Sequence, residues 1–94
     1  GKYRYAYLGD STKPNVNTKL INILRESVIS VDSAGNLIVI KTLSGSANAA
    51  AMVIDKLSID SVLGSIAGDD TLLVIVKSAK KVQEVMSTLN GLMH

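Results

Sequence analysis

Apolar residues recur along the chain with helical and strand periods, and these periods predict the order of its elements. A first helix of about three turns is expected after Asn17, a good N-cap residue, because apolar residues then follow at helical spacing: Leu20, Ile21, Leu24 and Val28. Ile29 and Val31 alternate with polar residues, which predicts a strand. Residues 33–36 have turn composition and residues 37–43 form a second strand, so the two strands are predicted to make a hairpin.

The rest of the chain continues with a helix, a second hairpin and a last helix. The middle helix is predicted to open at Gly45 and Ser46, since small and apolar residues then share one face: Ala47, Ala50, Ala51, Ile54 and Leu57. Residues 62–67 and 71–76 are expected to pair through a turn at residues 68–70. Ser78 is the predicted N-cap of the last helix and Gly91 its predicted C-cap residue. The residues of this helix that are expected to face the core are Val82, Val85, Met86 and Leu89.

This order predicts an α/β (α+β) two-layer sandwich. One helix followed by two strand–strand–helix units suggests a four-stranded antiparallel sheet with its helices on one face. Residues 37–40 and 72–76 are apolar at every position, whereas a sheet with one solvated face normally alternates. The second face therefore needs a cover, and we favour another copy of the chain over the alternative that the first helix crosses to that side.

The first residues differ in composition from the rest. Tyr3, Tyr5 and Tyr7 alternate with other residues, which predicts a short strand, and residues 9–17 contain the only proline, Pro14, among turn-forming residues. We expect a boundary here, between residues 1–16, which end in a linker, and a domain formed by residues 17–94.

Composition limits the classes of function. The chain has 94 residues, of which 47% are hydrophobic and 19% charged, as expected of one folded domain. It has no cysteine and a single histidine, His94, so a zinc site is not expected. The net charge of +2 comes from scattered residues, so no nucleic-acid stripe is predicted. No apolar run approaches the roughly 20 residues of a membrane span, and no signal peptide is recognisable, which favours a cytoplasmic protein.

Two adjacent carboxylates, Asp69 and Asp70, lie in the predicted turn between very apolar strands. Alone they are best explained as turn formers. However, Asp55 follows Asn48 by two helical turns and shares its face, about 10 Å along the axis. If that face looks toward the turn, an amide and up to three carboxylates converge near the start of a helix.

Such a site has mixed polarity. Carboxylates suit a guanidinium, while the amides of Ser46 and Ala47, expected to be open at the helix start, suit an anion. A zwitterionic basic amino acid satisfies both. Metal-dependent catalysis is the alternative, but the paired carboxylates lack the additional ligands and phosphate-binding residues of a two-metal site, so we expect no enzyme, no metal and no cofactor.

Two blocks of sequence are similar to the C-terminal domain of bacterial arginine repressors. The first comprises residues 32–42 (DSAGNLIVIKT) and 45–49 (GSANA), and the second comprises residues 63–71 (LGSIAGDDT). The resemblance extends from about Asn17 to the end of the chain. It implies a domain that forms trimers, two of which stack into a hexamer with L-arginine bound where they meet.

The resemblance also implies roles for particular residues. Asp69 binds arginine within its own trimer, Asp70 reaches the opposing trimer, and Asn48 contributes a polar side chain. Asp55 is a further acidic position, and the remaining contacts come from the backbone around Ala47, Ser65 and Ala67. Asn48 is shorter than the glutamine more familiar there, so a bridging water would complete its contact.

In this family a winged helix-turn-helix domain precedes the arginine-binding domain and binds operator DNA. Residues 1–5 resemble the last wing strand, so the resemblance implies that residues 1–16 are the end of that wing and its linker. It also implies DNA binding only through a domain missing here. The function expected is therefore arginine sensing and oligomerisation for a transcriptional repressor of arginine metabolism. The alternative is a structural oligomerisation domain without a ligand response.

Overall fold

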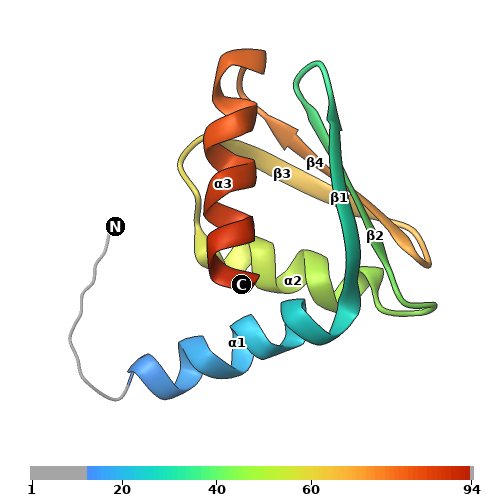
Figure 1. Ribbon diagram of the computed structural model, residues 1–94, viewed down its shortest axis with the longest axis vertical. Helices are drawn as coiled ribbons and strands as arrows, with labels where there is room; N and C mark the ends of the chain where they lie inside the picture. The colour runs from blue at the N-terminus through green and yellow to red at the C-terminus, as the bar shows by residue number, and fades with distance from the viewer. Residues whose placement is uncertain (1–12, 94) are drawn as a thin grey trace.

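The computed structural model describes residues 13–93 of the chain, and the side chains of residues 18–93 (Figure 1). The elements follow the predicted order, beginning with a helix and continuing with two strand–strand–helix units. Their bounds are α1 Lys13–Ser27, β1 Val28–Ala34, β2 Leu37–Thr42, α2 Ala47–Leu57, β3 Val62–Ala67, β4 Thr71–Val76, a short 3-10 turn η1 Ala79–Lys81 and α3 Val82–Met93.

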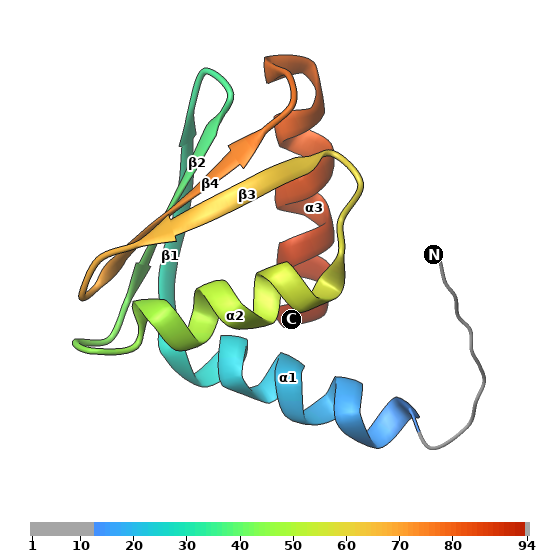
Figure 2. The same ribbon diagram turned by 180° about the vertical axis from the view of Figure 1, so that it is seen from behind.

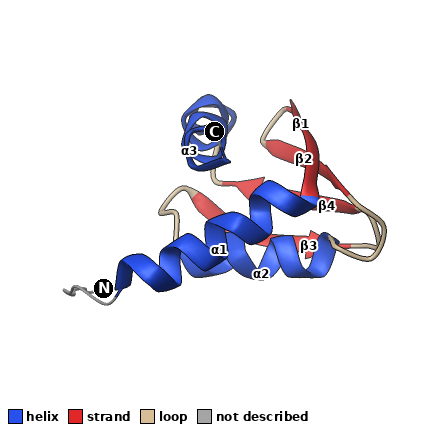
Figure 3. Ribbon diagram, turned by 60° about the horizontal axis from the view of Figure 1, so that its bottom comes forward, coloured by secondary structure: helices blue, strands red, loops and turns tan. Residues whose placement is uncertain are grey.

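The four strands form one antiparallel sheet in the order β1-β2-β4-β3. The very apolar strands β2 and β4 are therefore central, and each hairpin places its less apolar strand at an edge. The helices occupy one side of the sheet (Figure 3), with α2 and α3 packed on the strands and α1 packed against α2 and α3. The predicted α+β two-layer fold is confirmed.

The side chains of β2 and β4 alternate between the two faces of the sheet. On the helix side they are buried, with exposed fractions of 1% or less: Ile38, Ile40, Leu72, Val74 and Val76. The core also receives small residues of α2, and the fully buried Ala47 and Ala50 allow this helix to approach the strands closely. Leu24 of α1 and Leu89 of α3 close the core from the other side.

The opposite side of the sheet is apolar, and no helix or strand among residues 13–93 covers it. We name as the open sheet face the five apolar residues Leu37, Val39, Ile66, Leu73 and Ile75. Leu73 lies opposite Val39 on one side and Ile66 on the other, and Ile66 is 64% exposed. Because α1 lies with the other helices, the alternative that it crosses over to cover this face is wrong.

The first helix begins earlier than predicted. Helix α1 starts at Lys13, whereas residues 13–17 were expected to belong to a linker and to the cap. Proline is tolerated in the first turn of a helix, where its missing N–H has no intrahelical acceptor to lose, so Pro14 does not stop α1. The strand predicted around Tyr3, Tyr5 and Tyr7 lies outside the described residues.

Two β-bulges change which face some apolar residues occupy. The pairing of β1 with β2 slips between Val28 and Ser30, so Ile29 is the extra residue and is 65% exposed instead of sharing the face of Val31. The corresponding slip in β3 leaves Leu63 66% exposed. At the end of the chain, Gly91 lies inside α3, so its predicted role as a C-cap residue is wrong.

Candidate ligand-binding site

Backbone hydrogen bonds hold the turn between β3 and β4 against the start of α2. The N–H of Ala47 donates to the carbonyl of Asp69 at 3.2 Å, and the N–H of Thr42 donates to the carbonyl of Asp70 at 2.8 Å. Figure 2 shows this turn and the start of α2 at the same end of the domain. The two carboxylates that the sequence singled out are therefore fixed beside the N-terminus of a helix.

The chain enters α2 through a tight turn. Gly45 has φ +78°, a left-handed conformation that favours glycine, and the N–H of Ser46 donates to the carbonyl of Leu43 at 3.0 Å. The amides of Ser46 and Ala47 are thus both occupied by carbonyls of the chain itself. The expectation that these two amides are open to an anion is wrong.

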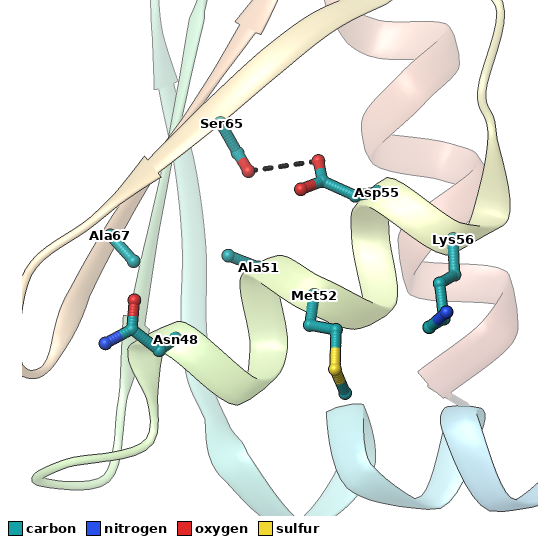
Figure 4. A pocket seen from close by; sticks show the side chains of 7 residues that line it. All are labelled: Asn48, Ala51, Met52, Asp55, Lys56, Ser65 and Ala67. Carbon is teal, nitrogen blue, oxygen red and sulfur yellow. Dashed lines mark hydrogen bonds between the residues drawn. The ribbon is translucent and has the colours of Figure 1, made fainter.

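A pocket of about 480 Å³ lies between α2 and β3 (Figure 4). Its lining comprises Asn48, Ala51, Met52, Asp55, Lys56, Ser65 and Ala67. Ser65 and Ala67 pair with Val74 and Leu72, both buried on the helix side, so the two small residues also face α2. Because these residues and Ala51 are small, they leave a space that larger side chains would fill.

Several residues predicted for the site meet in this pocket. Asn48 and Asp55 share one face of α2, as their spacing predicted, and Ser65 and Ala67 face them from β3. The hydroxyl of Ser65 donates to Oδ1 of Asp55 at 3.2 Å, which links the two elements across the pocket. Asn48 lies at the end nearer the β3–β4 turn.

The prediction did not include Met52 and Lys56, and it assigned Ala51 only to the core. Met52 and Lys56 follow Asn48 by four and eight residues, so helical spacing alone could have placed both beside it. Ala51 is nearly buried, with 9% exposed, and serves as both core and pocket residue. Lys56 adds a cationic group to a lining that otherwise carries the carboxylate of Asp55.

Asp69, Asp70 and Ala47 do not line this pocket but form the part of the site next to it. Both carboxylates are exposed, and Ala47 is fully buried, so Ala47 contributes through the hydrogen bond that positions Asp69. Oδ1 of Asp70 accepts a hydrogen bond from the Thr71 hydroxyl at 3.1 Å. That hydroxyl in turn accepts one from Nζ of Lys41 at 2.9 Å.

The arrangement offers acceptors for a cation and donors for an anion. The acceptors are the carboxylates of Asp55, Asp69 and Asp70, together with the amide oxygen of Asn48. The amides of Asn48 and Ala49, in the first turn of α2, have no hydrogen-bond partner within residues 13–93. Over the same residues, no three side chains of the metal-binding types lie close enough to hold a metal ion.

Fold and site together define a small α+β domain with one open apolar sheet face and a partly acidic pocket between its second helix and its third strand. The family model for the C-terminal domain of the arginine repressor matches residues 24–91. The chain belongs to this family. None of the helices described is long and apolar enough to cross a membrane.

Individual relatives agree with the family match. The chain is 45% identical over 93 residues to the arginine repressor of Alkaliphilus oremlandii, covering 99% of this chain and 62% of the relative. It is 47% identical over 89 residues to an arginine repressor of Clostridium botulinum, covering 95% of this chain and 59% of the relative. It is 43% identical over 91 residues to the arginine repressor of a Thermoanaerobacter species, covering 97% of this chain and 60% of the relative. The chain thus spans about three fifths of the length of these relatives.

Proposed function

We propose that this chain is the L-arginine-sensing assembly domain of a transcriptional repressor of arginine metabolism. The observation that carries the proposal is the hydrogen bond from the Ala47 N–H to the Asp69 carbonyl, which holds an acidic turn at one end of the pocket. The family membership supports the same assignment, since the relatives are named arginine repressors.

The ligand fits the chemistry of both parts of the site. A guanidinium presents five donors in a planar fork that two carboxylates can hold together. Asp69 of one copy and Asp70 of another can supply these carboxylates, because both residues are exposed. The pocket lined by Asn48 and Asp55 then takes the rest of the amino acid, and the open amides at the start of α2 suit its carboxylate. Asn48 reaches the ligand directly or through one water, with backbone groups of Ser65 and Ala67 beside it.

Assembly is the second half of the proposal. Copies of the chain cover the open sheet face in a trimer, and two trimers stack into a hexamer with arginine between them. In this arrangement Asp69 binds the ligand of its own trimer and Asp70 that of the opposing trimer. The hexamer presents operator-binding domains that lie outside this chain, and the repressor acts in the cytoplasm.

A structural oligomerisation domain without a ligand response is the second candidate. One observation favours it: the carboxylate of Asp55, which lines the pocket, already has a partner within the chain, because it accepts a hydrogen bond from Ser65. A site whose acceptors are satisfied internally gains less from a ligand than an unpaired one. Asp69 has no such side-chain partner within the described residues, which keeps a ligand response the better assignment.

Calorimetric titration with three amino acids separates the candidates. We expect L-arginine to bind with an affinity at least about tenfold above that of citrulline, since citrulline lacks the charge that makes hydrogen bonds to a carboxylate strong. Lysine is expected to bind more weakly as well, because an ammonium cannot match two carboxylates with a planar fork. Absence of arginine binding would leave the structural domain as the function, and equal binding of citrulline would exclude a carboxylate–guanidinium contact.

A further inference from the structure

We propose that Lys41 and Thr71 are positioning residues that hold the Asp70 carboxylate ready for the guanidinium. This inference rests on the proposed function, because it assigns a role at the same site. It concerns two side chains that the prediction from sequence did not include and that the pocket lining does not contain. Lys41 is on β2 and Thr71 on β4, next to the acidic turn. Both side chains are on the face of the sheet opposite the helices.

The register of the sheet brings these two side chains together. Lys41 and Thr71 are opposite each other in the antiparallel pairing of β2 with β4, although 30 residues separate them in sequence. Such opposite residues point to the same face of a sheet and are close enough for a direct contact. Nζ of Lys41 lies 2.9 Å from the Thr71 hydroxyl oxygen, which lies 3.1 Å from Oδ1 of Asp70.

The chemistry of the three groups fixes the direction of both hydrogen bonds. An ammonium can only donate and an ionised carboxylate can only accept. The Thr71 hydroxyl oxygen therefore accepts a hydrogen bond from the Lys41 ammonium. The single proton of this hydroxyl is then donated to the Asp70 carboxylate. A hydroxyl that accepts from a cation is also polarised, which strengthens its own donation to the carboxylate.

This chain of hydrogen bonds orients a side chain that is otherwise exposed. Oδ1 of Asp70 is held toward Thr71, while Oδ2 has no partner within residues 13–93 and stays available to an incoming donor. Two further bonds support the same turn, from the Gly68 N–H to the Thr71 carbonyl and from the Thr42 N–H to the Asp70 carbonyl, both at 2.8 Å. The backbone and the side chain of Asp70 are therefore both ordered before the ligand arrives.

Ordering one side chain before binding lowers the entropy lost on binding. We expect Thr71→Val, which removes the hydroxyl but keeps the shape and the strand preference, to weaken L-arginine binding by about threefold to tenfold. Thr71→Ser keeps the hydroxyl and is expected to restore most of the affinity. The unfolding midpoint of each variant shows whether the domain is intact.

Lys41→Met gives a test in which the two possible roles of Lys41 predict opposite results. If Lys41 only repelled the cationic ligand, its removal would tighten arginine binding. The positioning role predicts that binding becomes weaker, by about twofold or more, because the Thr71 hydroxyl loses the group that directs its proton. Tighter binding by Lys41→Met would overturn the proposal.

Both substitutions are then repeated in an Asp70→Ala background, with arginine affinity measured by calorimetry. A positioning role predicts that Thr71→Val has no further effect once Asp70 is absent, whereas a general structural role predicts the same loss in both backgrounds. If the parent chain binds arginine and Thr71→Val binds it equally well, this inference fails and the proposed function stands. If the parent chain does not bind arginine, the proposed function fails and the inference falls with it.

Discussion

Asp70→Asn is expected to weaken L-arginine binding by well over tenfold. The substitution keeps the shape of the side chain and removes its charge. Removing one partner of a desolvated, hydrogen-bonded charge pair costs about 2 to 5 kcal/mol, and each 1.4 kcal/mol corresponds to roughly tenfold in affinity. Asp69→Asn is expected to cause a comparable loss, because its carboxylate lies in the same turn. Calorimetry with L-arginine measures both.

Asp60→Asn is the matched control for these two variants. Asp60 is also an exposed aspartate, but it lies in the connection between α2 and β3 and lines no part of the site, so its removal should change arginine affinity little. If Asp70→Asn binds arginine like the parent chain and still assembles in response to it, the role proposed for Asp70 is wrong.

Leu73→Glu is expected to separate the assembly into folded monomers. Leu73 is at the centre of the open sheet face, between Val39 and Ile66 on the neighbouring strands, and its side chain points away from the core. In an assembly that covers this face, the new carboxylate would be buried without a partner at a cost of several kcal/mol per copy. The expected loss of association is at least about a hundredfold, measured by sedimentation velocity.

Gln83→Glu is the control for the change in charge. Gln83 is exposed on α3, so this variant adds the same negative charge on the helix side of the domain and should assemble like the parent. A Leu73→Glu variant that assembles like the parent would show that the open sheet face is not the interface between copies.

Much of the sheet could be predicted from the sequence because its signals are local. Strands β3 and β4 have the predicted bounds, Val62–Ala67 and Thr71–Val76, since apolar runs there end at residues that form turns. The apolar runs at residues 37–40 and 72–76, in the central strands, also predicted that the second face of the sheet needs a cover. The shared orientation of Asn48 and Asp55 followed from helical spacing alone.

Other features depend on how distant segments meet. The amides of Ser46 and Ala47 were expected to be free, but the carbonyl of Asp69 reaches Ala47 only after the second hairpin packs beside α2. The link from Lys41 to Thr71 requires the register between β2 and β4, which no local pattern fixes. The exposure of Ile29 likewise results from a bulge that periodicity does not show.

L-arginine is expected both to bind this domain and to favour its larger assembly. A ligand that binds the hexamer better than its separated halves must shift the equilibrium toward the hexamer, in proportion to the difference in affinity. Sedimentation velocity of the chain at micromolar concentration, over a series of arginine concentrations, tests this directly. We expect trimers that convert to hexamers as the arginine concentration increases. A monodisperse monomer with and without arginine would contradict it.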